Sequence, residues 1–133
     1  MSSIFSKIIQ RELPAYIVAE NERNMAILDI NPLAQGHVLV FPKVEVDKIY
    51  DLSSEDYTSL MLFSQQMSLL LQKAFLEKRI AMAVIGLEVP HAHIHLLPIT
   101  NPGELNFTKA KTPLDSETAA RVLAKIQSAE QQV

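Results

Sequence analysis

The chain has no cysteine, only three glycines among 133 residues, and no apolar run near the roughly 18 residues of a membrane span. The missing cysteine excludes disulfides and fits a reducing compartment. The first ten residues carry no apolar core of a signal peptide. The sequence therefore predicts a cytoplasmic protein that does not enter a membrane.

A basic surface is also missing. The 12 lysines and arginines are outnumbered by 15 aspartates and glutamates, which gives a formal net charge of -3 and a pI near 5.8. No Lys/Arg cluster with interleaved aromatic residues occurs. We expect no nucleic-acid partner, and any nucleotide must be bound by local contacts.

Repeats, low-complexity tracts and Pro/Gly-rich linkers are absent as well. The chain is of single-domain size, and with 48% hydrophobic residues it can bury a real core. We expect one domain over residues 1–133.

The most informative stretch of the chain lies between Pro90 and Pro98, where three of the four histidines alternate with apolar residues. These histidines are His91, His93 and His95. Strict alternation predicts a half-buried strand over residues 92–98 with the imidazoles on one face, about 7 Å apart. All three could then contact one small substrate.

Three interpretations of this row compete. The histidines could be unrelated surface or core residues, although three in phase make that a poor explanation. They could bind a metal ion, but the outer pair reaches one ion with difficulty and no cysteine completes a ligand set. The third interpretation is chemistry on phosphorus, since neutral imidazole is a nucleophile and imidazolium donates to phosphate oxygens. We favour the third.

The H-x-H-x-H spacing followed by two apolar residues resembles the signature of the histidine triad (HIT) family of nucleotide hydrolases and transferases. Further blocks resemble the family in the same order along the chain: residues 4–9 (IFSKII), 13–15 (LPA), 28–32 (LDINP) and 36–43 (GHVLVFPK). The resemblance covers about residues 3 to 98.

The resemblance implies a covalent mechanism. The central His93 would attack the α-phosphorus of a nucleoside monophosphate ester, amide or anhydride, and water would then release the monophosphate. His91 and His95 would donate to the phosphate oxygens or the leaving group, and His37 would hold the cluster in register. No metal and no cofactor are required.

The resemblance also implies a purine nucleotide as substrate. Asp29 would accept hydrogen bonds from both ribose hydroxyls, although an aspartate before Asn-Pro is by itself more often a turn former. Phe5, Ile8, Ile27 and Leu39 would line the base pocket. Phe5 and Ile8 also fit a simple packing helix.

The chain departs from the family at two places. Many zinc-bearing members have a C-x-x-C motif and a histidine where this chain has Ser3, Ser6 and Glu45, so we expect no structural zinc. In the phosphoramidase-like branch, an asparagine and a Ser/Thr contact the phosphate and leaving group. Here Ile85 occupies the asparagine position, and no donor replaces either group.

A shortened loop places Glu88 three residues before the triad. A carboxylate beside the leaving group would disfavour dinucleoside polyphosphates relative to singly charged adenylate amides or esters. Alternatively, Glu88 points into solvent. Because the phosphate-contacting groups are missing, a weakly active or non-catalytic purine nucleotide-binding module stays open as the alternative function.

The predicted fold class is α+β. Five mainly antiparallel strands are expected at about residues 16–20, 25–29, 37–42, 80–85 and 92–98. A long helix should run from Ser53 to near Lys78-Arg79, with an apolar stripe and Ser53 as N-cap. Shorter helices are expected at residues 3–10 and 115–128. By resemblance, two such units pair into a homodimer with a continuous sheet.

Overall fold

The computed structural model describes residues 2–130. The predicted domain range 1–133 therefore includes four residues, Met1 and 131–133, that lie outside the described part.

Five antiparallel strands form one sheet in the order β1-β2-β3-β5-β4. The strands are β1 (Ile17–Glu20), β2 (Asn24–Leu28), β3 (Val38–Pro42), β4 (Arg79–Ala83) and β5 (Ile94–Ile99). The α+β class and the five-stranded antiparallel sheet expected from the sequence are confirmed.

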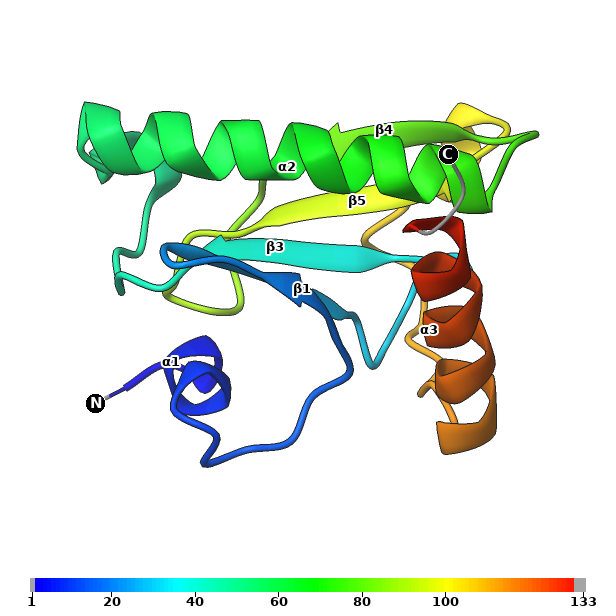
Figure 1. The fold of residues 1–133 in the computed structure, drawn as a ribbon, viewed down its shortest axis with the longest axis horizontal. Coiled ribbons are helices and arrows are strands. Elements are labelled where there is room, and N and C mark those ends of the chain that lie inside the picture. Colours follow the sequence, from blue (N-terminus) through cyan, green and yellow to red (C-terminus); the bar gives the residue numbers. More distant parts are fainter. Residues whose placement is uncertain (1, 131–133) are drawn as a thin grey trace.

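Three α-helices cover the sheet unequally. They are α1 (Ile4–Ile9), α2 (Ser54–Ala74) and α3 (Ser116–Glu130), with short 3₁₀ helices η1 (Ile49–Asp51) and η2 (Pro102–Glu104) in the connections. Figure 1 shows α2 running along one side of the sheet, α1 on the other side and α3 at one end. Neither α2 nor any other helix within residues 2–130 combines the length and apolar character of a membrane span.

The strands divide their side chains between two apolar clusters, because successive residues of a strand point to opposite faces. On the α2 side, strand residues such as Val38, Val40 and Ile94 pack with α2 and α3. On the α1 side, Phe5 and Ile8 pack against residues of β2 and β3, including Ile27 and Leu39. The histidine face of β5 is the α1 face, because Leu39 pairs with His95 in the register of β3 and β5.

Helix α1 has only six residues, well below the length at which an isolated helix is stable. It begins because the hydroxyl of Ser3 accepts a hydrogen bond from the Ser6 backbone N–H. Phe5 and Ile8 are buried as expected, but Ile4 is 54% exposed. Tertiary packing of Phe5 and Ile8 therefore holds this helix.

Helix α2 begins at the predicted N-cap Ser53, and the six stripe residues that the sequence indicated are all buried: Leu60, Phe63, Met67, Leu70, Leu71 and Phe75. The predicted end near Lys78-Arg79 is wrong, because the helix ends at Ala74. The Gln72 side chain donates to the carbonyls of Phe75 and Lys78, which satisfies the turn into β4. Good helix formers occupy residues 76–79, so no local signal marked this end.

The expected strand over residues 92–98 is also partly wrong, since β5 begins only at Ile94. The His91 N–H donates to the carbonyl of Val89, and the Ala92 N–H donates to the carbonyl of Val46. These backbone groups are satisfied outside the sheet, so His91 and His93 lie on an irregular segment. The three imidazoles therefore do not form the evenly spaced row that alternation predicts.

The chain enters β3 through Gly36, whose φ of 90° favours glycine. A Cβ at this position would lie 2.7 Å from the ring of Phe75 at the end of α2. Gly36 thus allows the close approach of α2 and sets His37 at the start of β3.

Candidate active site

Four buried histidines gather where residues 91–95 run antiparallel to β3, from Pro42 at its end toward its start. His93 and His95 have ring centroids 5.0 Å apart, and those of His95 and His37 are 5.2 Å apart. His93 also packs edge-on against Phe5 of α1, with centroids 5.0 Å apart. The structure therefore brings together His37, His91, His93 and His95, which the sequence singled out.

The ring of His93 is oriented by the backbone just before it. Its Nδ1 lies 2.8 Å from the carbonyl oxygen of His91. A carbonyl oxygen only accepts, so Nδ1 carries the proton and Nε2 of the neutral ring keeps its lone pair. Within residues 2–130, Nε2 of His93 has no hydrogen-bond partner. His93 is thus set up as a nucleophile.

His95 has the opposite tautomer, and the backbone fixes it through His37. The Leu33 N–H donates to Nδ1 of His37 at 3.1 Å, so the proton of a neutral His37 lies on Nε2. That Nε2–H donates to Nδ1 of His95 at 3.0 Å. Nε2 of His95 therefore carries a proton and can donate to a phosphate oxygen or a leaving group.

The pKa values agree with these neutral rings. Burial, with a further contribution from His93, lowers the pKa of both His37 and His95 to about 4. Burial also lowers the pKa of His91, against the opposing effects of the Pro42 carbonyl and Glu45. At neutral pH all three rings are neutral, as the assigned tautomers require.

His91 has a different environment from the one its place in the motif predicts. Its Nε2 donates to the carbonyl of Pro42 at 2.7 Å, and its Nδ1 accepts from the hydroxyl of Ser3 at 2.7 Å. The ring is fully buried, with 0% exposure. Both nitrogens are used by the protein, so in this geometry His91 does not offer a donor to substrate. It holds the carbonyl that orients His93.

Ser3 belongs to a small hydrogen-bond network that ties α1 to His91. The carboxylate of Glu45 accepts from the Ser3 N–H at 2.7 Å and from the Ser6 hydroxyl at 2.6 Å. These two hydrogen bonds hold the pKa of Glu45 at about 2. The network thus runs from Glu45 through Ser3 to His91, whose carbonyl accepts the hydrogen bond from Nδ1 of His93.

The three residues at the zinc-ligand positions of the resemblance are Ser3, Ser6 and Glu45. Two neutral hydroxyls and one carboxylate are a poor zinc set. Their oxygen atoms are also bonded to one another or to His91. This donor set does not fit a structural zinc ion.

Asp29 follows β2 and has two tasks in the structure. Its Oδ1 accepts from the Asn31 N–H at 2.8 Å, which is the turn-forming role that the local sequence favours. Its Oδ2 lies 3.5 Å from Nε2 of His37, and the side chain is 17% exposed. Asp29 is thus placed beside the histidines with one oxygen outside the turn.

The four residues predicted for the base pocket lie together in the apolar cluster on the α1 face: Phe5, Ile8, Ile27 and Leu39. They are all less than 9% exposed, and Phe5 stacks on Phe41 with centroids 4.4 Å apart. The cluster borders His93 through Phe5. The structure thus gathers the four residues in one cluster beside His93, and their role in a base pocket stays a prediction.

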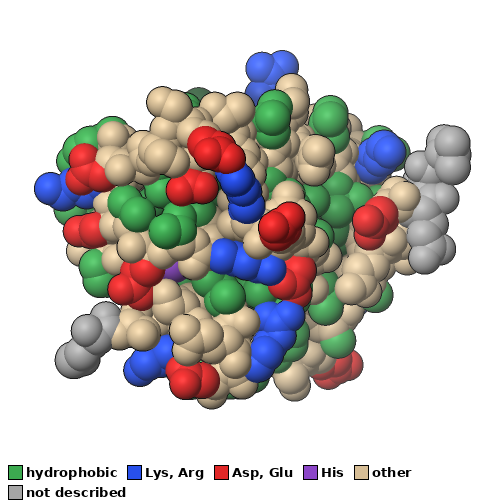
Figure 2. All heavy atoms as spheres, turned by 60° about the vertical axis from the view of Figure 1, so that its left-hand side comes forward, with side chains coloured by type: hydrophobic (Ala, Val, Ile, Leu, Met, Phe, Trp, Pro, Cys, Tyr) green, Lys and Arg blue, Asp and Glu red, His purple; other side chains and the backbone are tan. Residues whose placement is uncertain are grey.

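Glu88 lies on the exposed loop between β4 and His91, and its carboxylate forms an ion pair with Lys111 at 2.7 Å. This contact lowers the pKa of Glu88 and raises that of Lys111. The sequence did not predict this partner, because residues 109–113 carry no pattern that marks them as part of a site. Figure 2 shows basic and acidic side chains interspersed over this side of the molecule, with only a small area of histidine exposed.

Phe107 is a second residue that the sequence did not indicate. Its ring meets His95 edge-on, with centroids 4.7 Å apart, and lies 6.5 Å from the ring of His37. A lone phenylalanine in an irregular segment gives no signal of such a contact. The path of residues 105–114 brings its ring against His95 and His37.

Asp29, His37 and His95 also have ligand atoms within 4.8 Å of one another, the one such group among residues 2–130. However, Nε2–H of His37 donates a hydrogen bond to Nδ1 of His95, and Nδ1 of His37 accepts from the Leu33 N–H. A metal ion would have to displace the proton of the first hydrogen bond. The donor set is therefore better explained as a hydrogen-bonded chain.

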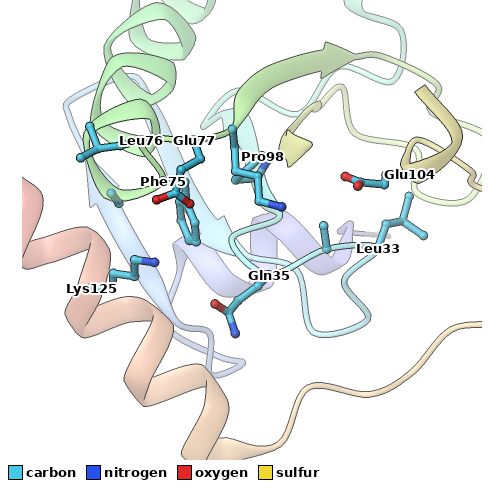
Figure 3. A pocket seen from close by; sticks show the side chains of 11 residues that line it. Leu33, Gln35, Phe75, Leu76, Glu77, Pro98, Glu104 and Lys125 are labelled. Atoms are coloured by element: carbon cyan, nitrogen blue, oxygen red, sulfur yellow. The ribbon is translucent and has the colours of Figure 1, made fainter. Parts of the chain in front are cut away.

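A separate cleft lies between the end of α2 and α3 and contains none of the histidines (Figure 3). It is lined by charged side chains such as Glu77 and Lys125 and by Phe75, with the ammonium of Lys125 4.3 Å from the Phe75 ring centre. It offers no nucleophile with a neighbouring donor. We therefore assign the chemistry to the histidine cluster.

Comparison with known proteins identifies the domain. The sequence profile of the HIT domain matches residues 10–101. The chain is 32% identical over 96 residues to adenosine 5'-monophosphoramidase of Saccharomyces cerevisiae, covering 71% of this chain and 61% of that protein. It is 35% identical over 82 residues to bis(5'-adenosyl)-triphosphatase of Dictyostelium discoideum, covering 58% of this chain and 55% of that protein. The chain thus spans somewhat over half the length of these relatives.

A solved structure extends the similarity to almost the whole chain. The HIT-like protein of Bartonella henselae involved in cell-cycle regulation superposes with a TM-score of 0.84 at 26% identity, covering 96% of both chains. The terminal helices α1 and α3 thus lie within the region covered by this likeness.

The lowered pKa values predict acid sensitivity of the fold. Between pH 6.5 and about 4 the unfolded chain binds protons on His37 and His95 that the folded protein does not. The free energy of unfolding should therefore fall as the pH drops through this window, by up to about 1.4 kcal/mol per pH unit for each residue. Denaturant titrations at a series of pH values measure this slope.

His37→Gln is the control for this measurement, because it removes one of the three rings whose pKa burial lowers. The slope between pH 6.5 and about 4 should become shallower in this variant. An unchanged slope would show that His37 does not remain neutral in the folded protein.

Proposed function

The chain belongs to the HIT family, and from the geometry of its histidines we propose that it is a hydrolase or nucleotidyl transferase acting at the α-phosphate of purine nucleoside monophosphate amides, esters or anhydrides. The similarity to an adenosine 5'-monophosphoramidase and to a bis(5'-adenosyl)-triphosphatase supports chemistry at a nucleotide phosphate.

One observation carries the proposal. Adjacent rings 5.0 Å apart hold opposite tautomers, with a bare Nε2 on His93 and a protonated Nε2 on His95. A nucleophile and a donor side by side are what displacement at phosphorus needs, and positioning supplies most of the catalysis in such reactions. Both tautomers are set by backbone groups rather than by solvent.

The proposed reaction has two steps. Nε2 of His93 bonds to the α-phosphorus and the bond to the leaving group breaks, while the neutral His95 donates a hydrogen bond through Nε2–H to the leaving atom or a phosphate oxygen and keeps its proton. The leaving atom takes its proton from solvent. Water then attacks the nucleotidyl-histidine, the phosphorus–nitrogen bond breaks, Nε2 of His93 regains its lone pair, and the proton of water passes to solvent. The products are the nucleoside monophosphate and the free leaving group. His37 orients His95, and His91 positions His93 instead of donating to phosphate.

We further propose that Asp29 accepts from the ribose hydroxyls through Oδ2, the oxygen that the turn leaves outside. Its place beside His37 supports this role, because the α-phosphate and the ribose are neighbours in a nucleotide. Phe5 packs against His93, and with Ile8, Ile27 and Leu39 of the same apolar cluster it would supply the contacts to the base.

A homodimer is part of the proposal. Strand β4 is an edge of the sheet, and it presents half-exposed Met82. Helix α2, which contacts β4, exposes Leu62 and Leu69, and Leu76 just beyond its end is exposed seven residues further on. An unpaired edge beside an apolar helix row suits a second copy of the chain. The cytoplasmic location and the single domain expected from the sequence stay predictions.

Replacing the nucleophile tests the mechanism directly. His93→Ala should abolish turnover of an adenosine 5'-phosphoramidate while nucleoside monophosphate binding stays within about tenfold, because a nucleophile acts chiefly in the transition state. Acid-labile label should be trapped on the wild-type protein during turnover of a labelled adenylate, and not on the variant.

Retained turnover by His93→Ala would overturn the assignment of the nucleophile. Nucleotide binding by the wild type without turnover or trapped label would instead favour the non-catalytic binding module. The absence of the family's asparagine at Ile85 is the feature that keeps this alternative open.

Asp29→Asn tests the ribose contact without losing the turn, since the amide oxygen can still accept from the Asn31 N–H. The amide nitrogen cannot accept from a ribose hydroxyl, so ribonucleotide binding should weaken by about 1–2 kcal/mol. Calorimetry with adenosine monophosphate and with the analogue that lacks both ribose hydroxyls measures the difference. A variant that still distinguishes the two ligands as the wild type does would refute the role of Asp29.

Leu69→Glu tests the dimer, because it places a charge in the middle of the exposed row on α2. The wild type should sediment as a dimer and this variant as a monomer. Leu13→Glu is the matched control, since Leu13 is an exposed leucine outside α2 and β4. A monomeric wild type, or a dimer that persists in Leu69→Glu, would contradict this interface.

A further inference from the structure

Residues 105–114 cross the histidine cluster although they lie beyond the match to the HIT profile, which ends at residue 101. The segment is anchored at its far end, where the Leu114 N–H donates to the carbonyl of Ile30 at 2.7 Å. Ile30 directly follows Asp29. The segment therefore runs from η2 to the loop that carries the proposed ribose ligand.

Two side chains of this segment reach the site from outside. Phe107 packs edge-on against His95, the proposed donor to the leaving group. Lys111 pairs with Glu88 on the loop that leads into the triad. The segment thus places an apolar ring against His95 and a cation against the loop that leads into the triad.

The ion pair at the rim lies within electrostatic range of the reacting groups. Electrostatic interactions with His95 and His93 contribute to the lowered pKa of Glu88, and one with Asp29 contributes to the raised pKa of Lys111. The sequence alone suggested that Glu88 would repel anionic leaving groups. Lys111 offsets that negative charge at the very loop where the family's phosphate-contacting groups are missing.

The Lys111–Glu88 pair is easily broken. The side chains are 50% and 74% exposed, and an ion pair this open to water contributes little to stability. The lysine ammonium is a compact charge on a flexible stem, so it can exchange one anionic partner for another at little cost. An anion held near Glu88 would compete for it directly.

We propose that Lys111 and Glu88 together select the leaving group. Lys111 binds an anionic group of the leaving portion, and Glu88 competes with that group for Lys111. Phe107 forms the wall beside His95. The ligand class is an adenylate whose leaving group carries a carboxylate or phosphate. This inference rests on the proposed function.

Two substrates that differ by one carboxylate test it: the adenosine 5'-phosphoramidates of phenethylamine and of phenylalanine. Lys111→Ala should lower kcat/KM for the phenylalanine amide by about 3–10-fold and change that for the phenethylamine amide by less than about twofold. The loss should shrink as salt is added, because the pair is exposed. Lys109→Ala, the same charge change two residues away, is the matched control and should leave both values unchanged.

Glu88→Gln distinguishes leaving-group selection from a purely structural role of the ion pair. If the pair only holds the two segments together, Glu88→Gln and Lys111→Ala both break it, and both should change activity in the same direction. Selection predicts opposite signs, since Glu88→Gln frees Lys111 and should raise kcat/KM for the phenylalanine amide. Equal effects of Lys111→Ala on the two substrates, or a shared sign for the two variants, would overturn the inference. A wild type that cleaves neither amide would instead count against the proposed function.

Discussion

The hydrogen bond from Nδ1 of His93 to the carbonyl of His91 is the contact on which the site depends. It decides which nitrogen of His93 keeps the lone pair for the proposed attack on phosphorus, because a carbonyl oxygen accepts a hydrogen bond and never donates one. The carbonyl can orient His93 only if it is itself held in place. The ring of His91 holds it, because Nε2 hydrogen-bonds to the carbonyl of Pro42 and Nδ1 to the hydroxyl of Ser3. The motif suggests His91 as a donor to substrate, but in this geometry it positions His93.

The same logic runs through the second pair of histidines. A backbone N–H at Leu33 sets the tautomer of His37, which sets that of His95. Each ring is neutral because it is buried, so the chain of donors and acceptors stays unambiguous at neutral pH. The burial that penalises charge on His37 and His95 thus also keeps the donor and the acceptor of this pair distinct, and the predicted acid sensitivity of the fold has the same origin.

Sequence patterns predicted the sheet, the N-cap Ser53 and the stripe of α2, because periodicity and capping are local properties. They failed at the end of α2 and at residues 91–93. In both places the decisive hydrogen bonds come from elsewhere in the chain, such as the Val46 carbonyl that receives the Ala92 N–H. The motif located the histidines but could not assign their tautomers, and nothing local marked Phe107 or Lys111 as neighbours of the site.

The network around Glu45 gives α1 a role beyond packing. A six-residue helix has little stability of its own, yet its first turn supplies the Ser3 hydroxyl that His91 needs. Glu45 holds that turn through two hydrogen bonds that favour its ionised form. A carboxylate and two hydroxyls therefore do by hydrogen bonding what a metal ion does by coordination, which is to lock a helix end to the segment behind it. Fixing α1 and orienting His93 are one task here, because Phe5 on that helix also packs against the ring of His93.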